Sequence, residues 1–402
     1  MRDEIFELEE RGAQVTGMAC DVGDLEQVRA LGRHALDTFG HYDRGMLGST
    51  LHTVASARAM RRTLDELPLI RAQDTLLAGT GMPYARWLTA TEPDDPVWQT
   101  MRFGAALDRI EIPVLLQAGW QDRFTEQQFE EYARLAGRGV PVSLTVGDWT
   151  HVQTVAKGWG RLTRETLDWL DAHLSEGRPA ASVRATYPVR VQLMGTSQWR
   201  SLPAWPPATT ERVLHLHSGG RLAAGVPAAR AVPSRFTYDP ADPTPAVGGR
   251  VVTPAMAGRR DNRALEARPD VLTSTSAELT EPLEVLGRPV VHLAHGTENP
   301  PADLFVRLCE VAPDGRSTNL SDGFVRLAPG EASGLVSVEL ETLAHRFVVG
   351  TRLRLQVSGG AHPRFARNLG AEEDPATGTT MLPSQRTLGH GPDASRLVLP
   401  CG

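Results

Sequence analysis

The chain has 402 residues, enough for two or three domains of about 100–200 residues each. Hydrophobic residues make up 41% and charged residues 22%, values typical of a folded globular protein, which excludes a disordered or fibrous chain. The net charge is −6, with 42 Lys and Arg against 48 Asp and Glu, so we expect no basic face for nucleic acid or an anionic membrane.

Cysteine usage and the N-terminus bear on the compartment. Cys20, Cys309 and Cys401 are far apart and lack metal-binding spacing, so neither a disulfide framework nor a zinc site is expected. The first residues are charged and contain no apolar signal segment, and no apolar run reaches the ~18–20 residues of a membrane span. These features predict a cytoplasmic protein.

The first part of the chain combines helices with a few strands. Residues 1–43 are expected to form a helix, a short strand, a turn and a second helix, and residues 44–108 are mostly helical, with several prolines as breakers. Residues 109–178 alternate strand and helix: strand 113–118, helix 125–135, strand 142–146 and helix 162–174. The run at 113–118 (PVLLQA) is continuously apolar, which is typical of a strand buried on both faces. This order predicts a parallel sheet with right-handed crossovers.

Residues 179–402 have a different texture, with a linker predicted at 177–180 (GRPA). Short alternating runs recur between turn residues, at 189–194, 212–217, 289–294, 304–311, 335–340 and 352–358. Many short strands with hardly a helix indicate a β-sandwich or jelly roll. Within these runs, Arg307 and Arg326 are expected to face outwards. The predicted fold class is therefore α/β plus β.

Two segments that directly follow predicted strands carry the chemistry. Asp122 ends the segment 119–122 (GWQD), and His151 ends the segment 147–151 (GDWTH), 29 residues later. The carboxyl ends of parallel strands meet at one edge of a sheet, so an Asp that orients a His is expected there, as in the acid–base half of a serine-hydrolase triad. The alternative for Asp122 alone is an N-cap for helix 125–135. Trp98, Trp120 and Trp149 are expected as walls of a substrate pocket or as core residues.

These motifs resemble those of the α/β-hydrolases of the cocaine esterase type, which are grouped with X-Pro dipeptidyl peptidases and α-amino-acid ester hydrolases. That family has a G-x-W/Y-D loop for the triad Asp and a G-P-W-T/S-H loop for the triad His, and this chain has Asp148 where proline is usual. The resemblance continues through further segments: 94–98 (DDPVW), 194–195 (MG), 302–305 (ADLF), 313–315 (PDG), 350–355 (GTRLRL) and 362–368 (HPRFARN).

The resemblance covers residues 44–402 and implies a helical cap at 44–108, the C-terminal part of an α/β-hydrolase domain at 109–178 and a galactose-binding-like jelly roll at 179–402. It implies a serine hydrolase of small carboxylic esters or amides that needs no metal or cofactor, with Asp122 and His151 as triad members, and a homodimer in some relatives.

The nucleophile motif of that family, G-x-S-x-G, does not occur in the sequence. Ser49 lacks the preceding strand and the second glycine, and Ser197 lies in the β-rich part, so neither has the strand-to-helix elbow that exposes a nucleophilic hydroxyl. Residues 1–43 instead resemble an internal slice of a short-chain dehydrogenase, with Asp21 matching a residue beside the adenine ring. The glycine-rich loop that binds pyrophosphate is missing from this slice, so no nicotinamide site is expected.

Two functions remain open at this stage. By resemblance the chain is a serine hydrolase, expected to be inactive alone because it lacks the nucleophile motif. The alternative is a non-catalytic remnant whose jelly roll binds a carbohydrate or a protein. The predicted strand 113–118 would have one unpaired apolar edge, to which a second polypeptide could add the nucleophile half.

Overall fold

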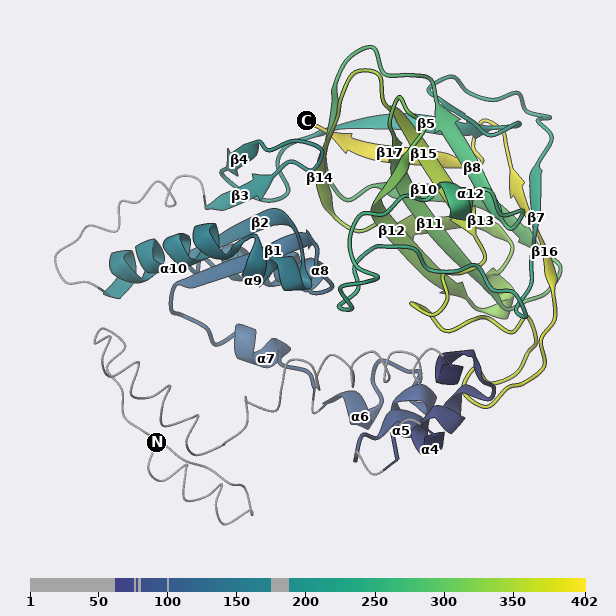
Figure 1. Cartoon of the computed structure of the whole chain (residues 1–402), viewed down its shortest axis with the longest axis horizontal. Helices are drawn as coiled ribbons and strands as arrows, with labels where there is room; N and C mark the ends of the chain where they lie inside the picture. The colour runs from purple at the N-terminus through teal and green to yellow at the C-terminus, as the bar shows by residue number, and fades with distance from the viewer. Residues whose placement is uncertain (1–61, 76, 79–80, 100, 175–187) are drawn as a thin grey trace. The chain divides into compact units, whose positions relative to one another are not determined.

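A computed structural model describes residues 62–75, 77–78, 81–99, 101–174 and 188–402 of the chain. Residues from Glu66 to Gly402 form one compact unit, and Met1–Asp65 form the other. The prediction for residues 1–43 lies outside the described residues, which begin at residue 62. The helices and strands labelled in Figure 1 all belong to the unit Glu66–Gly402.

Short helices occupy the first part of this unit, as the prolines predict. They are η1 (Leu69–Arg71), α4 (Ala72–Thr75), α5 (Tyr84–Thr89), α6 (Pro96–Gln99) and α7 (Gly104–Leu107). An α/β segment follows, with β1 (Val114–Gln121), α8 (Thr125–Gly137), β2 (Val142–Thr150), α9 (His151–Ala156), α10 (Trp159–Leu174), β3 (Val189–Gln192) and β4 (Trp199–Leu202).

The predicted parallel sheet is confirmed. The order is β1-β2-β3-β4, in which β1 pairs in parallel with β2, β2 in parallel with β3, and β3 in antiparallel fashion with β4. Helices α8 and α9 pack against β1 and β2, and α10 contacts β1 (Figure 1). The run 189–194 was predicted to belong to the β-rich part, but it extends the first sheet as β3. The prediction is wrong because an alternating pattern does not specify which sheet a strand joins.

The first four residues of β1 are only half-buried, and the last four are buried. Complete burial was predicted from the apolar run. Among the described residues, however, β1 pairs with β2 alone and is an edge strand of the sheet. Its apolar side chains are thus less covered than those of a central strand.

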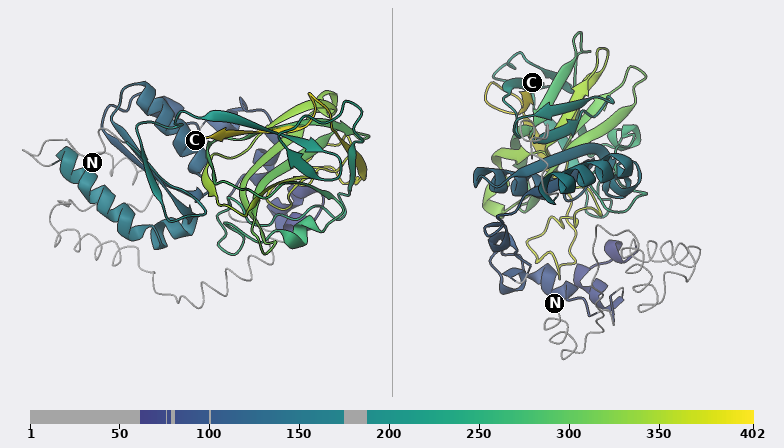
Figure 2. Two further views of the ribbon diagram at one scale, coloured as in Figure 1. Left: turned by 90° about the horizontal axis from the view of Figure 1, so that it is seen from above. Right: turned by 90° about the vertical axis from the view of Figure 1, so that its left-hand side faces the viewer.

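The rest of the chain is almost entirely β-structure, joined by hydrogen bonds into a 13-stranded sheet among the described residues. Figures 1 and 2 show its strands folded into a β-sandwich-like body. The elements are β5 (Thr210–His217), β6 (Arg221–Ala223), β7 (Ser234–Tyr238), α12 (Arg263–Glu266), β8 (Val271–Ser276), β9 (Leu283–Gly287), β10 (Val290–Thr297), β11 (Ala302–Val311), β12 (Ser317–Leu327), η2 (Pro329–Glu331), β13 (Gly334–Glu339), β14 (Leu343–Phe347), β15 (Arg352–Ser358), β16 (Ser384–Gly389) and β17 (Arg396–Cys401).

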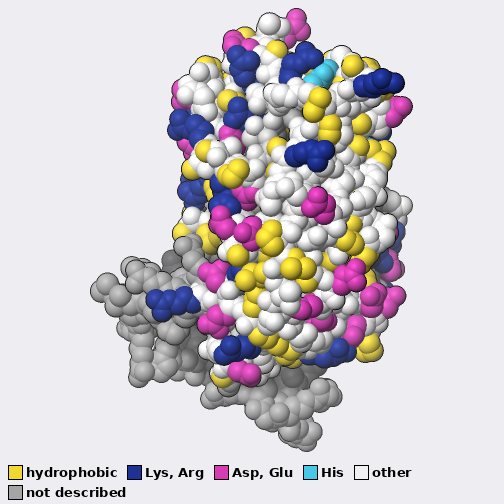
Figure 3. Space-filling model, turned by 90° about the vertical axis from the view of Figure 1, so that its right-hand side faces the viewer, with side chains coloured by type: hydrophobic (Ala, Val, Ile, Leu, Met, Phe, Trp, Pro, Cys, Tyr) yellow, Lys and Arg dark blue, Asp and Glu magenta, His cyan; other side chains and the backbone are white. Residues whose placement is uncertain are grey.

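One hydrophobic core runs through both sheets. It includes Leu144 and Val146 of β2, Val191 of β3 and Leu304 and Val306 of β11, all fully buried. On the face drawn in Figure 3, Lys and Arg side chains are scattered among Asp and Glu side chains. None of the helices in the described part of the chain combines the length and apolarity needed to cross a lipid bilayer.

Arg307 contradicts the sequence-based prediction. Its side chain is 1% exposed and donates from Nε and Nη2 to the two carboxylate oxygens of Asp322, at 2.6 and 2.8 Å. Alternation along a strand tells which residues share a face but not what covers that face; here the loop before α12 covers it, through Val247 and Asn262. Arg326 is partly exposed and pairs with Asp303.

Candidate active site

Asp122 and His151 lie at the same edge of the first sheet, as predicted. Asp122 directly follows β1, and His151 directly follows β2 as the first residue of α9. The strands are in register from Val114 opposite Val142 to Gly119 opposite Gly147, and a bulge then places Gln121 opposite Thr150. The two functional side chains thus leave adjacent strand ends.

The two side chains are in contact. His151 Nδ1 is 3.1 Å from one carboxylate oxygen of Asp122 and 3.3 Å from the other. An ionised carboxylate only accepts hydrogen bonds, so this contact assigns the proton of the neutral imidazole to Nδ1 and leaves Nε2 as its basic nitrogen. The Asp122 side chain is 9% exposed and that of His151 is 43% exposed. The carboxylate is shielded from water while the imidazole stays accessible.

The backbone around Asp122 fixes its carboxylate. The Phe124 amide donates to Asp122 Oδ1 at 3.1 Å, and the buried Thr125 hydroxyl donates to the carbonyls of Gly119 and Asp122 at 2.6 and 3.0 Å. Phe124, not Asp122, is the N-cap residue of α8, and no side chain caps that helix end. The capping alternative for Asp122 is therefore wrong.

His151 is held by the start of its own helix. Thr150 is the N-cap of α9 and forms a capping box with Gln153, in which each side chain bonds the other residue's backbone amide. The Phe124 ring packs edge-on against the imidazole, with 5.5 Å between ring centroids. The Thr-x-x-Gln spacing is a sequence signal that could have located this capping box. Nothing in the sequence marks Phe124.

The three tryptophans occupy different surroundings. Trp120 is fully buried and stacks on Phe129, and its indole N–H donates to the Gln192 carbonyl at 2.7 Å. It is therefore a core residue and not a wall of a pocket. Trp149 is buried and lines a cavity of about 320 Å³ together with Thr150. Trp98 is half-buried on α6, and its indole N–H donates to the Ala90 carbonyl.

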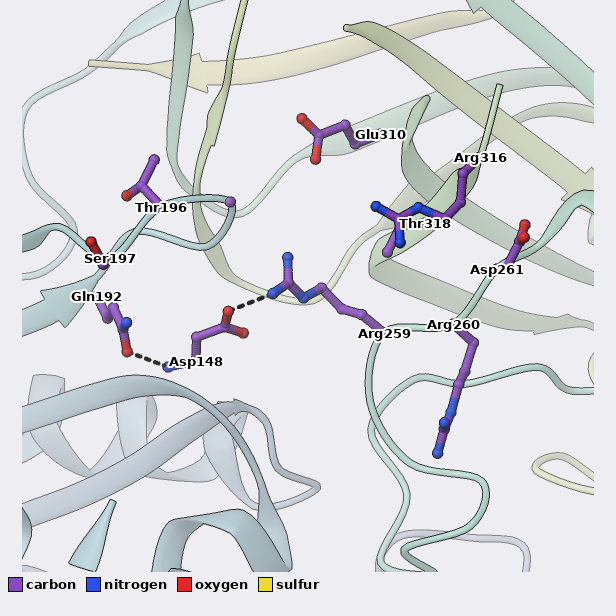
Figure 4. A pocket seen from close by; sticks show the side chains of 11 residues that line it. Asp148, Gln192, Thr196, Ser197, Arg259, Arg260, Asp261, Glu310, Arg316 and Thr318 are labelled. Carbon is purple, nitrogen blue, oxygen red and sulfur yellow. Dashed lines mark hydrogen bonds and ion pairs between the residues drawn. The ribbon is translucent and has the colours of Figure 1, made fainter. Parts of the chain in front are cut away.

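Neither candidate serine completes this pair within the described residues. Ser49 lies outside them. Ser197, in the turn after β3, lines a polar cavity that includes Asp148 but not His151 (Figure 4). Asp148, the residue at the usual proline position, forms an ion pair of 2.6 Å with Arg259 from the β-rich part. In the described part of the chain, no three His, Cys, Asp or Glu side chains are grouped to hold a metal ion.

Comparison with known proteins gave two family matches. Residues 29–153 match the X-Pro dipeptidyl-peptidase (S15 family), and residues 181–398 match the X-Pro dipeptidyl-peptidase C-terminal non-catalytic domain, which alone spans more than half of the chain. The first match begins inside the segment 1–43.

Individual relatives agree with these matches. The cocaine esterase of Rhodococcus sp. (strain MB1 Bresler) is 28% identical in an alignment 358 residues long, which covers 80% of this chain and 60% of the esterase. Among solved structures, an α-amino acid ester hydrolase is similar with a TM-score of 0.71 at 24% identity, covering 82% of this chain and 62% of that one. An aminopeptidase from a marine sediment Thaumarchaeota archaeon has a TM-score of 0.72 at 20% identity, covering 85% and 63%. This chain thus spans less than two thirds of the length of each of these three relatives.

Proposed function

Because the chain belongs to the X-Pro dipeptidyl-peptidase (S15) family, which includes hydrolases of the cocaine esterase type, we propose that Asp122 and His151 are the acid–base pair of a serine hydrolase. The observation that carries the proposal is the contact of 3.1 Å between a shielded carboxylate and Nδ1 of an accessible imidazole at the ends of parallel strands. The substrate class is a small carboxylic ester or amide.

In this proposal each side chain has one task. His151 Nε2 accepts the proton of a serine hydroxyl as the serine attacks the carbonyl carbon, and then donates this proton to the leaving alcohol or amine. Asp122 accepts the Nδ1–H bond, keeps the imidazole in the tautomer with Nε2 free, and stabilises the imidazolium that forms. Neither task requires a metal or a cofactor.

The serine, in this proposal, comes from a second polypeptide that carries the nucleophile elbow. The sequence has no G-x-S-x-G, and no described strand pairs with the other edge of β1, where an added strand could bind. We expect the chain alone to have no hydrolytic activity.

The finer domain assignment belongs to the same proposal. It divides the chain into a cap at 44–108, the C-terminal part of an α/β-hydrolase domain at 109–178 and a galactose-binding-like jelly roll at 179–402. The short helices of the first segment, the parallel strands β1 and β2 of the second and the 13-stranded sheet of the third support it. Strands β3 and β4, which complete the first sheet, lie in the third segment. A cytoplasmic homodimer remains an expectation.

The decisive experiment is complementation. The chain is treated with a fluorophosphonate and with p-nitrophenyl butyrate, first alone and then mixed with the part of the Rhodococcus cocaine esterase that the chain does not cover. We expect no serine adduct and no hydrolysis from the chain alone, and both from the mixture. His151→Ala in this chain should abolish the gain, and Asp122→Asn should reduce turnover by about four orders of magnitude.

Two results would contradict the proposal. A stoichiometric adduct on a serine of the chain alone, lost on His151→Ala, would place the nucleophile within this chain. A mixture that is folded but gains no hydrolysis would favour the non-catalytic alternative, in which the β-rich part is a binding module.

A further inference from the structure

A second cavity, separate from the Asp122–His151 pair, is lined by polar and charged residues apart from Gly195 (Figure 4). Its volume is about 760 Å³, and its walls come from both sheets and from the loop before α12. The residues that line it are Asp148, Gln192, Gly195, Thr196, Ser197, Arg259, Arg260, Asp261, Glu310, Arg316 and Thr318. Ligand sites of this size are usually lined by apolar groups. An apolar ligand here would remove charged groups from water without replacing their hydrogen bonds.

The carboxylates of this cavity already have partners. Asp148 pairs with Arg259 at 2.6 Å, and Asp261 pairs with Arg263, outside the lining, at 2.6 Å. Glu310 is 3.4 Å from Nε2 of the fully buried His345. Burial raises the pKa of Glu310, but His345 and Arg259 outweigh burial and hold this pKa below its usual value, so the carboxylate is ionised at neutral pH.

The hydrogen-bond donors, in contrast, are not all used. Among the described residues, the Arg316 guanidinium forms no hydrogen bond and no ion pair within 4.0 Å, and the hydroxyl groups of Ser197 and Thr318 have no hydrogen-bond partner. The pKa of Asp261, in the same cavity, is lowered mainly by Arg263, and the charge of Arg316 helps to lower it. Figure 4 shows Arg259, Glu310 and Arg316 extending toward the wall that carries Thr196 and Ser197. The Arg260 guanidinium extends away from them and donates to two backbone carbonyls, of Pro254 and Ala255.

We propose that this cavity binds a small, water-soluble ligand through an oxyanion group, a carboxylate or a phosphate, with Arg316 as the principal cation. A guanidinium presents paired N–H donors that match the two oxygens of such a group. The Ser197 and Thr318 hydroxyls are available to donate to the same group or to a neighbouring polar atom of the ligand. This inference does not depend on the proposed hydrolase function, because it concerns a different cavity and is tested by anion affinity and not by hydrolysis.

The test is calorimetric titration of the full chain with inorganic phosphate and with malonate at constant ionic strength. We expect saturable binding. The anion that binds with the higher affinity, phosphate or malonate, identifies the oxyanion class. Arg316→Ala should weaken binding about tenfold or more, since it removes a charged hydrogen-bond donor. The matched control is Arg230→Ala, an equal charge change at an exposed arginine outside the cavity, which should leave the affinity unchanged.

A second variant tests the sign of the ligand charge. Glu310→Gln removes a negative charge from the same wall, so it should tighten the binding of an anion, while a cationic ligand would show the opposite pattern. Circular dichroism and thermal unfolding of each variant check that the fold is retained. The proposal is overturned if neither anion binds saturably at millimolar concentration, if Arg316→Ala binds as tightly as the unaltered chain, or if Glu310→Gln weakens binding in a folded protein.

Discussion

Gly119 and Gly147 allow the ends of β1 and β2 to approach closely. A Cβ atom on Gly147 would lie 2.4 Å from the Trp149 ring, and one on Gly119 would lie 2.4 Å from the Trp149 carbonyl oxygen. Real Cβ atoms do not approach heavy atoms this closely, so any larger residue would push Trp149 away. Trp149 is two residues before His151. The glycine of each motif therefore helps to aim the imidazole at Asp122.

His295 gives a residue-scale prediction about pH. Burial lowers its pKa to about 4, against the opposing effect of its hydrogen bond with the Ala332 carbonyl. As the pH falls below 6.5, His295 becomes protonated in the unfolded chain, whereas in the folded chain it stays neutral until about pH 4. The free energy of unfolding should therefore fall over this window as the pH is lowered, by about 3 kcal/mol for this group.

The measurement is urea denaturation between pH 7 and pH 4. His295→Gln, whose side-chain amide can still donate to Ala332, should flatten this part of the profile. His173→Gln, which replaces an exposed histidine of α10, should leave it unchanged. An unaltered slope in His295→Gln would show that the buried histidine does not control this pH dependence.

At the residue scale, the sequence predicted the contacting pair but not its surroundings. The spacing of Asp122 and His151 after two predicted strands was enough, since parallel strands end at one edge of the sheet. Phe124 and Arg307 were missed for the same physical reason. Their places depend on which distant loop or ring covers them, and no local pattern encodes that.

Helix α8 connects the site to the β-rich part through Glu126, four residues after Asp122. Its carboxylate accepts hydrogen bonds from Arg250 and Arg288, each at 2.5 Å, and from the amide and hydroxyl of Thr342 at 2.7 and 2.8 Å. Arg250 in turn pairs with Glu341, which also pairs with Arg364. These alternating charges fix the start of α8 against the second sheet.

Glu126→Gln should lower the free energy of unfolding by about 1–3 kcal/mol, less than for a fully buried pair because the side chain is 28% exposed. Burial raises the pKa of Glu126, but Arg250, Thr342 and Arg288 outweigh it and hold the pKa below its usual value. The stabilisation is thus present above pH 4.5 and is lost as the pH falls through the lowered pKa.

Glu130→Gln is the matched control for Glu126→Gln, one turn later on the same helix, where the side chain is exposed. It should change the free energy of unfolding by no more than about 0.5 kcal/mol. The measurement is urea denaturation of both variants at pH 7. We expect a lower midpoint for Glu126→Gln than for Glu130→Gln, with the same dependence of the free energy of unfolding on urea concentration. Equal midpoints for both variants would mean that the Glu126 network adds no net stability.

At the scale of elements, the sequence located β1, α8, β2 and α10 to within about four residues at each end, whereas α9 and β4 were not predicted. Strand 142–146 is found within β2 and helix 125–135 within α8. The neighbours of each strand were harder to predict. The run 189–194 has the alternation of a β-sandwich strand, yet it pairs in parallel with β2, because hydrogen-bond partners far along the chain decide sheet membership.

For the whole molecule, the proposed complementation requires the edge of β1 that has no partner strand among the described residues. The Val114 amide faces β2, since it donates to the carbonyl of Pro141, the residue before β2. Bonds in a parallel pair come from alternate residues, so the amides of Leu116 and Ala118 also face β2, while those of Leu115 and Gln117 face the open edge. These two amides have no strand partner among the described residues.

Hydrogen exchange at residue resolution tests this edge. In dilute solution the amides of Leu115 and Gln117 should exchange rapidly, while the amide of Leu144 in β2, bonded to the Pro188 carbonyl, should be protected. Adding the nucleophile-bearing polypeptide should slow exchange at Leu115 and Gln117 and leave Leu144 unchanged, because an added strand supplies acceptors only at the edge. Protection of Leu115 and Gln117 in the chain alone would mean that the edge is already covered, and a second polypeptide could not then pair along β1.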